Sequence, residues 1–349
     1  MKKRKNSQDK PAYPVTRARE AGFSSFPSPG APGDLYYLLR REIPIIDAAI
    51  TKLCRLVGGF EIKCSSKEAT AFCKWINENV EVNGNANGVE AFLSVYFEQL
   101  LTLGTAVGEI ITDCGGMPCG LYNSQISNLL FKRSDNGFDT ELYVLDIEGE
   151  RPVKAKEKIL MSVLNPLPGC ITGVSILEGL GFMGKILHKI YETIGENWER
   201  AGALRYAVTY KPANNPTDTA LAAERASQIA SAWEKSMTGG GISDFITVGD
   251  VDISVIGKDG PVLNSEVPVR QILEQIIAKT GLPPYLLGLS WSSTERMSQG
   301  QTDILTTELW HYRRLLTPVI NKIFTYFLRK NGFTDSFEIV WDEISIIDS

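Results

Sequence analysis

The sequence predicts an α+β protein, and three features lead to that prediction. Residues 34–165 alternate between segments of helical period and short segments of strand character. Two long segments with helical spacing of apolar residues stand on either side of a small insert, residues 204–260. A third long apolar-striped segment, residues 302–331, carries a proline near its middle. Helices and strands that follow each other in blocks indicate an α+β architecture.

Composition permits two or three structural units. The chain has 349 residues, of which 43% are hydrophobic and 22% charged, enough to fold around real cores. It has no run of about 18 apolar residues, so no membrane span is expected. The basic start, Met1 to Lys5, is not followed by an apolar segment and does not resemble a secretory signal. The six cysteines are scattered, so reduced thiols of a cytosolic protein and no metal site are expected.

Charge is distributed unevenly along the chain. Residues 1–20 hold seven Lys or Arg and two Asp or Glu, whereas the rest holds 29 basic and 39 acidic residues. A protein that grips DNA usually presents a basic face. This acidic body therefore either does not meet nucleic acid or meets DNA without holding it.

The first 33 residues are basic and then rich in Pro, Gly and Ser. This composition predicts a flexible arm. Two interpretations stay open at this point: a solvated tail, or a strap onto a neighbouring subunit or a capsid wall.

The patterns in residues 34–172 predict a first structural unit of helices and strands. Ile46, Ile50, Leu53 and Val57 step by four, three and four, with Pro44 before them, and predict a helix. Ser65 followed by Glu68 has the spacing of a capping box and predicts the start of a second helix. Further elements are predicted as a helix over Val89–Leu103 and strands over Thr105–Thr112, 128–132 and 141–145, the last two joined at the turn signal Asn136-Gly137.

Residues 173–203 predict a long helix. Its apolar stripe begins at Ile176, and residues 175–200 would span about 39 Å at about 1.5 Å per residue. Residues 204–260 then predict a compact insert, with strands at 206–210, 245–248 and 252–256 and an Ala-rich helix at 216–236. Residues 261–288 predict a second helix, over 264–280, and the turn Gly281-Leu-Pro-Pro-Tyr-Leu-Leu-Gly288.

A polar run of residues 289–301 separates this turn from the last long helix. Long loops inside compact architecture are usually functional or disordered. One interpretation is a disordered surface loop, and the other is a flexible loop that projects into a channel. The candidate site residues of this loop are Ser290, Trp291, Ser292, Ser293, Thr294, Glu295, Arg296, Met297, Ser298 and Gln299.

The last helix contains Pro318, which removes a backbone hydrogen bond and predicts a kink. Residues 302–349 are thus expected to form a kinked helix and a terminal strand.

A glycine-rich segment offers an alternative function. Gly179, Gly181 and Gly184 spell G-x-G-x-x-G, and the same stretch to Lys185 nearly spells a P-loop. Ile186 stands where a P-loop needs Ser or Thr, and the apolar stripe is expected to run through the glycines without interruption. Close helix packing is therefore the preferred interpretation, and a nucleotide-binding enzyme is the alternative.

Catalytic chemistry finds little support in the sequence. The two histidines, His188 and His311, sit within helical patterns, and no combination of nucleophile, base and oxyanion donor can be assembled. No catalytic residue and no cofactor are predicted.

The order of these segments resembles that of portal proteins of tailed bacteriophages and prophages. The resemblance rests on the Gly281 to Gly288 turn, the Ser293-Thr294 pair in the loop after it, the proline in the following helix, and Gly173-Val-Ser-Ile-Leu177 at the first long helix. It implies an α+β wing (34–172), a helical stem (173–203 and 261–288), a clip (204–260), a tunnel loop (289–301) and a kinked wing helix with a terminal strand (302–349).

The resemblance also implies a function. Such a protein forms a ring, of twelve subunits in assembled particles, through which double-stranded DNA is packaged, retained and ejected. Its expected partners are further copies of itself, the DNA, the large terminase subunit, a head–tail adaptor and the major capsid protein. Its expected location is the capsid vertex of the virion, after assembly in the bacterial host cytoplasm. A plain α+β scaffold that never meets DNA is a further alternative.

Overall fold

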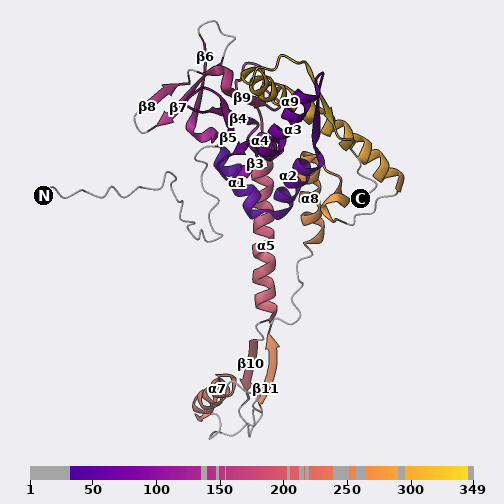
Figure 1. Ribbon diagram of the computed structural model, residues 1–349. Helices are drawn as coiled ribbons and strands as arrows, with labels where there is room; N and C mark the ends of the chain where they lie inside the picture. The colour runs from indigo at the N-terminus through magenta and orange to yellow at the C-terminus, as the bar shows by residue number, and fades with distance from the viewer. Residues whose placement is uncertain are drawn as a thin grey trace, which may run out of the picture. The chain divides into compact units, whose positions relative to one another are not determined.

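The computed structural model describes residues 32–134, 140–146, 149–153, 155–202, 205–211, 216, 220–238, 251–256, 265–289 and 295–344. They belong to two compact units (Figure 1): unit 1 reaches to Lys185 and resumes at Gln275, and unit 2 covers residues 186–274. Both units combine helices with β-strands, so the predicted α+β class is confirmed. Of the predicted arm, residues 1–33, positions 1–31 lie outside the described residues.

Unit 1 begins with two helices that a proline separates. α1 covers Pro32–Glu42, and α2 covers Pro44–Leu56. Ile43 between them is extended, with φ −122° and ψ 93°, because the ring of Pro44 disfavours helical backbone in the residue before it. The sequence predicted α2 but not α1, whose short apolar stripe follows a Pro- and Gly-rich stretch.

The N-terminal cap of α3, Lys67–Asn79, differs from the predicted one. The N-cap is Ser66, whose side chain accepts a hydrogen bond from the main-chain nitrogen of Ala69, so the predicted pair Ser65 and Glu68 does not form the capping box. The hydroxyl of Ser65 instead lies 3.2 Å from that of Ser336. One residue of difference in the helix start moves the capping role from one serine to the next.

The main core of unit 1 lies between α4 and a five-stranded sheet. α4 covers Val89–Leu103, as predicted, and packs on β4, Thr105–Thr112. The strand order is β3-β2-β5-β4-β9, where the other strands are β3 (Ala86–Asn87), β2 (Glu81–Val82), β5 (Pro118–Asn123) and β9 (Ile159–Val163). Buried side chains on α4, such as Phe92, Tyr96 and Leu100, fill the space between the helix and the sheet.

Two smaller sheets complete unit 1. β6 (Leu129–Arg133), β7 (Thr140–Asp146) and β8 (Gly149–Pro152) form an antiparallel meander, which agrees with the predicted hairpin, although its turn signal lies outside the described residues. β1 (Phe60–Cys64) pairs antiparallel with β12 (Phe337–Trp341), the predicted terminal strand. Short 3-10 helices precede β6 (η1, Ile126–Asn128) and β9 (η2, Lys156–Lys158).

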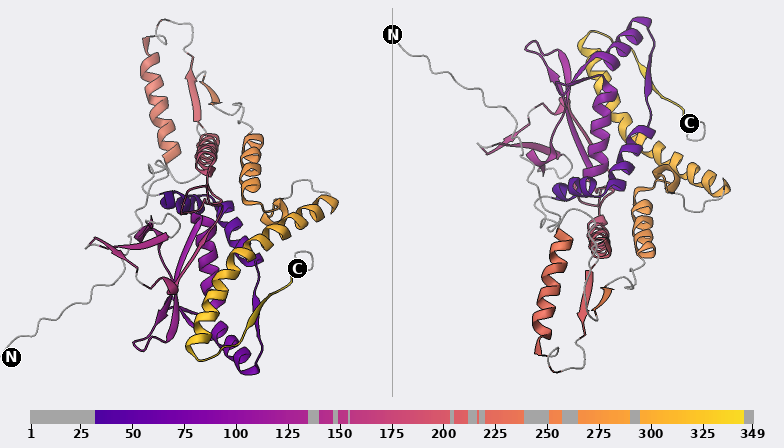
Figure 2. Two further views of the ribbon diagram at one scale, coloured as in Figure 1. Left: turned by 90° about the horizontal axis from the view of Figure 1, so that it is seen from above. Right: turned by 90° about the horizontal axis from the view of Figure 1, so that it is seen from below.

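Besides α7 (Ala222–Thr238) of unit 2, the second half of the chain has three long helices among the described residues. α5 covers Leu180–Gly202, α8 covers Glu266–Thr280, and α9 covers Glu295–Lys330. Between α8 and α9 the turn contains the 3-10 helix η3, Pro284–Leu287. Figure 2 shows α9 as one long helix, coloured orange to yellow. α9 contacts α3, and just after α9 ends Phe333 stacks on Phe72 of α3.

The start of α5 differs from the prediction. The helix begins at Leu180, not near residue 175, because Gly179 has φ +86°, outside the helical region. Ile176 and Leu177 are buried before the helix begins. Their spacing continues the apolar stripe of α5, which is why the sequence alone suggested an earlier start.

Unit 2 contains an antiparallel pair of strands and a helix. β10 (Arg205–Tyr210) pairs with β11 (Val251–Ile256), and α7 (Ala222–Thr238) packs against β10. The predicted strands at 206–210 and 252–256 and most of the Ala-rich helix are therefore confirmed. The third predicted strand, residues 245–248, lies outside the described residues.

Candidate channel loop and its supports

The turn before the predicted loop is built from apolar residues and prolines. Leu282 and Pro283 are buried after the end of α8, and η3 packs against α2. Gly288 caps η3 in the left-handed conformation, with φ 75° and ψ 17°. The predicted loop thus follows a turn that packing against α2 holds in place.

A hydrogen bond joins the two ends of the loop. The hydroxyl of Tyr285, in η3, lies 2.8 Å from the hydroxyl of Thr302, in α9, and Thr302 is buried. Sixteen positions, including the whole predicted loop, lie between these two residues. The hydrogen bond therefore brings the two ends of this stretch together. The bond therefore fixes η3 relative to α9.

The structure shortens the predicted loop. α9 begins at Glu295, seven positions before the predicted start at Thr302, so Glu295, Arg296, Met297, Ser298 and Gln299 belong to the helix. Glu, Arg, Met and Gln are good helix formers, and a glutamate in the first turn interacts favourably with the helix dipole. The remaining candidate residues, Ser290, Trp291, Ser292, Ser293 and Thr294, lie outside the described residues. Gln299 is exposed on α9.

The helix after the loop is anchored by a buried apolar stripe. Its buried side chains include Leu305, Leu309, Tyr312, Leu316 and Ile323. The stripe faces β5, β9 and α3 of unit 1. Opposite it, Ile304 and Trp310 are exposed, at 66% and 46% of their surface, and they are available to a partner.

A buried arginine interrupts this stripe. Arg313 is only 1% exposed, and its Nε donates to the carbonyl of Val57 at 2.8 Å, while Nη1 donates to the carbonyl of Asp342 at 2.7 Å. Its guanidinium also lies about 5 Å from the rings of Trp310 and Trp341. Val57 is the C-cap of α2, where the helix dipole is negative. Arg313 thus joins α9 to α2 and to the end of β12.

Burial lowers the pKa of the Arg313 guanidinium, and the nearby charge of Asp342 opposes that change. An arginine remains charged in any case. The main-chain carbonyls and the aromatic faces replace the water that this cation loses on burial. Sequence analysis missed this residue, although a cation between Leu309 and Leu316 on the buried face was a signal for it.

Pro318 lies one turn further along α9. The helix continues on both sides of it. Beside the proline, the hydroxyl of Thr317 donates to the carbonyl of Arg313 at 2.7 Å and accepts from the indole nitrogen of Trp341 at 3.2 Å. Proline leaves one carbonyl of the preceding turn without its usual donor. The kink expected at Pro318 remains a prediction.

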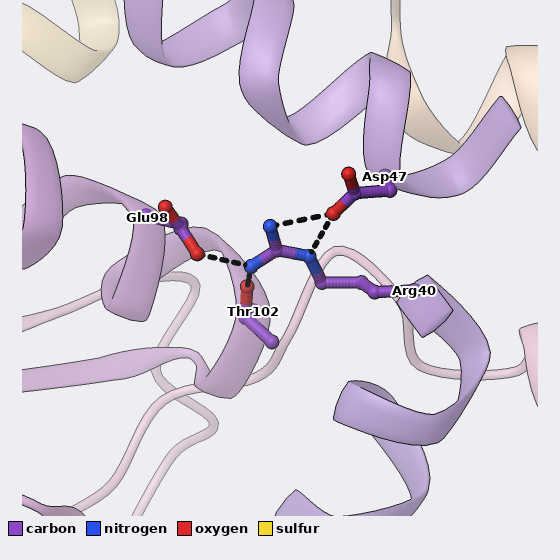
Figure 3. Close-up of polar contacts among 4 residues, drawn as sticks. All are labelled: Arg40, Asp47, Glu98 and Thr102. Atoms are coloured by element: carbon purple, nitrogen blue, oxygen red, sulfur yellow. Dashed lines mark hydrogen bonds and ion pairs between the residues drawn. The ribbon is translucent and has the colours of Figure 1, made fainter. Parts of the chain in front are cut away.

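A second arginine joins three helices near the start of unit 1 (Figure 3). Arg40 of α1 contacts Asp47 of α2 through Nε at 2.9 Å and Nη2 at 2.7 Å, and its Nη1 contacts Glu98 of α4 at 2.6 Å and Thr102 at 3.1 Å. The Arg40 side chain is 11% exposed, and the carboxylates stay close to half exposed. The pair of carboxylates raises the pKa of Arg40 against the opposing effect of burial. The cluster fixes the angle between α1, α2 and α4.

Two of the three glycines in the glycine-rich segment, Gly181 and Gly184, lie close to residues of α1 and to Ile43 after it. A Cβ on Gly184 would come within 2.8 Å of both Leu39 and Ile43, and one on Gly181 would lie 3.3 Å from Leu35. The residues before Gly179 form no strand. A dinucleotide site needs a strand before the glycines and an open helix N-terminus. The geometry therefore favours the packing role and disfavours the nucleotide-binding alternative.

The histidines contribute to helix surfaces. His188 Nε2 lies 3.3 Å from Glu192 on the same helix, and His311 is exposed beside Tyr312. Among the residues described in the ranges above, no three His, Cys, Asp or Glu side chains gather as metal ligands would. In the same part of the chain, no helix combines the length and the apolar character that crossing a membrane requires.

Comparison with known proteins finds solved structures with a similar fold. The sequence matches no family model and no curated protein. Among solved structures, a chain in the neck of an empty gene transfer agent (GTA) particle, computed with C6 symmetry, has a TM-score of 0.62 and 13% identity over 90% of this chain and 85% of that chain. A chain in the neck of a native GTA particle, computed with C12 symmetry, has a TM-score of 0.61 and 13% identity over 89% and 84%.

A weaker match involves an HK97 family phage portal protein from Corynebacterium diphtheriae, at 11% identity over 86% of this chain and 92% of that chain. Its TM-score of 0.45 is below the level at which a shared fold can be inferred. The two stronger matches cover both units, so the chain has the fold of a chain in the neck of GTA particles.

Proposed function

We propose that the chain is a portal protein of the tailed-bacteriophage and prophage family. In this role it forms a ring-shaped channel at one capsid vertex, through which double-stranded DNA is packaged, retained and ejected. The observation that carries the proposal is the fold shared with a chain of a GTA particle neck over about nine tenths of the sequence. The order of the wing, stem, clip, loop and kinked helix segments in the sequence supports it independently.

The ring is a homo-oligomer of twelve subunits. Reconstructions of the matched neck were computed with C6 and C12 symmetry, which agrees with that number. Each interface in such a ring is head-to-tail, so two different surfaces of the subunit meet. The exposed Ile304 and Trp310 on α9 and Phe182 on α5 are candidates for burial there.

The other partners follow from the segments. Residues 204–260, the clip, contact the large terminase subunit during packaging and the head–tail adaptor afterwards. Residues 34–172, the wing, contact the major capsid protein. The protein catalyses no reaction, and it resides in the virion after assembly in the host cytoplasm.

The loop acts as a sliding contact with DNA. The body outside residues 1–20 carries 29 basic and 39 acidic residues, so its net negative charge repels phosphate. Ser290, Ser292, Ser293 and Thr294 offer hydroxyl groups that exchange hydrogen bonds easily, and Glu295 and Arg296 nearly cancel in charge. The hydrogen bond between Tyr285 and Thr302 fixes η3, which precedes this segment, to α9, which follows it.

Imaging of the purified protein tests the ring. Negative-stain electron microscopy with native mass spectrometry should show rings with a central hole and a mass close to twelve times 38.5 kDa. A monomer that stays single in the presence of capsid and scaffold components would contradict the proposal. A stable dimer under those conditions would favour the plain scaffold alternative.

A loop exchange tests the channel role. Residues 290–294 are replaced by a Gly-Ser segment of equal length, and the matched control replaces residues 135–139, also five positions, in the connection between β6 and β7. Rings should form in both variants. DNA packaging or retention should fall only in the first variant, and normal packaging there would contradict a role of this loop.

A further inference from the structure

Two thiols of unit 1 are in contact. Cys64 is the last residue of β1, and Cys73 lies in the second turn of α3. Their sulfur atoms are 3.5 Å apart, and the two residues are nine positions apart in the sequence. Cys73 is fully buried, whereas Cys64 is partly exposed. Cys64 is therefore the more accessible residue of the pair.

The backbone around the pair is held in place. The hydroxyl of Thr70 lies 3.3 Å from the main-chain nitrogen of Cys64 and 3.4 Å from its carbonyl oxygen. The same hydroxyl lies 2.9 Å from the carbonyl of Ser66, the N-cap of α3. The end of β1 is thus fixed to the first turn of α3, and the contact between the thiols follows from secondary structure and capping.

We propose that Cys64 and Cys73 form a disulfide bond when the protein meets an oxidising small-molecule disulfide such as glutathione disulfide. The Cys64 thiolate attacks one sulfur of glutathione disulfide and releases one glutathione. The Cys73 sulfur then attacks the Cys64 sulfur of the mixed disulfide and releases the second glutathione. The two cysteines lose two electrons and two protons, and glutathione disulfide becomes two glutathione molecules.

The second step is the slow one. Burial, then the contact with Cys64 and the negative charge of Asp335, raises the pKa of the Cys73 thiol above its usual range. Because the thiolate is the nucleophile, ring closure should accelerate as pH rises. Cys114, Cys119 and Cys170 are exposed, and they provide internal controls for simple surface oxidation.

The bond would stabilise one edge of unit 1. β1 pairs with β12, and Phe72 of α3 stacks on Phe333 at a centroid distance of 5.3 Å. A disulfide between β1 and α3 restricts the unfolded chain and so favours this arrangement. Its use in the life of the protein rests on the proposed function, because a component of a particle passes from a reducing cytoplasm to oxidising surroundings. The chemistry of the pair does not depend on that role.

Mass spectrometry of the full chain tests the proposal. The protein is equilibrated with glutathione and glutathione disulfide at several ratios, quenched with acid, unfolded, alkylated with iodoacetamide and digested with trypsin. Lys63, Lys67 and Lys74 direct cleavage so that the disulfide links peptides 64–67 and 68–74. The linked pair should accumulate in oxidising mixtures and disappear in reducing ones. Cys64 carrying glutathione while Cys73 is alkylated would overturn the proposal.

Thermal unfolding gives a second measurement. Oxidation should raise the melting temperature by about 2–6 °C. The variants C64S and C73A should lose this shift, and C170S should keep it. C73A can start from a lower melting temperature than the parent chain. The shift on oxidation still tests the disulfide, since each variant is compared with its own reduced form. An equal shift in all three variants would contradict the assignment, and ring formation is unaffected by either result.

Discussion

The hydroxyl of Tyr285 lies 2.8 Å from the hydroxyl of Thr302, across the base of the candidate channel loop. Tyr285 belongs to a 3-10 turn that packs on α2, and Thr302 belongs to the buried face of α9. The contact holds together the turn before the candidate loop and the helix after it. It fixes η3 and α9 to each other within unit 1.

Removing one hydroxyl of this clasp should weaken unit 1 slightly. We expect Y285F to lower the free energy of unfolding by about 1 kcal/mol, the net value of a partly buried hydrogen bond. Chemical denaturation measures the difference. Y191F, at an exposed tyrosine of α5, is the matched control and should change little. In a double-mutant cycle, T302V should cost less in the Y285F background than alone, and full additivity would contradict the clasp.

Replacing the buried arginine should have a larger effect. R313M removes the donors to the carbonyls of Val57 and Asp342 and leaves the buried Val57 oxygen and the partly buried Asp342 oxygen without this partner. We expect a loss of about 3–5 kcal/mol in unfolding free energy. R314M, at the exposed neighbouring position, is the control. Similar losses in the two variants would show that the contacts of Arg313 contribute nothing specific.

The elements that the sequence predicted well have their causes within a few residues. α4 covers Val89–Leu103 as predicted, because its apolar stripe lies between Gly88 and Gly104. α2 begins at Pro44 as expected for a proline in the first turn. The turn Gly281 to Gly288 is likewise local, since prolines and a left-handed glycine define it.

The elements that it predicted poorly depend on distant residues or on competing local signals. The start of α9 was missed because residues 295–301 have little to bury, although their helix propensity is high. The start of α5 was placed too early because Ile176 and Leu177 are buried without being helical. The supports of the candidate site, such as the bond between Arg313 and Val57, join residues 256 positions apart, which no local pattern reveals.

Tyrosine titration should make unit 1 less stable in alkali. Burial, with a smaller contribution from the charge of Glu308, raises the pKa of Tyr312 from 10.0 to about 12. The unfolded chain therefore releases this proton from about pH 10 while the folded chain keeps it. The resulting stability is complete below pH 10 and is lost as pH rises toward 12, with a total of about 2–3 kcal/mol.

The variant Y312F tests this origin. Phenylalanine preserves the ring contact with Phe97, whose centroid lies 5.2 Å away, and removes the titrating group. The stability of Y312F should fall less steeply between pH 10 and 12 than that of the parent chain, as measured by urea denaturation across this range. Part of the slope should remain, since burial also raises the pKa of Tyr96. Identical slopes would assign the alkaline loss to other groups.

The glycine-rich segment at the start of α5 gives the sharpest test between packing and nucleotide binding. A Cβ at Gly184 would lie 2.8 Å from side-chain carbons of Leu39 and Ile43, closer than packed carbons approach. G184A should therefore lower the unfolding free energy by about 1–3 kcal/mol. G195A, on the same helix with nothing within 4 Å of the added carbon, should be neutral or stabilising by up to about 1 kcal/mol. Labelled ATP and NAD should bind neither parent nor variants, and saturable binding that G184A abolishes without loss of stability would restore the nucleotide alternative.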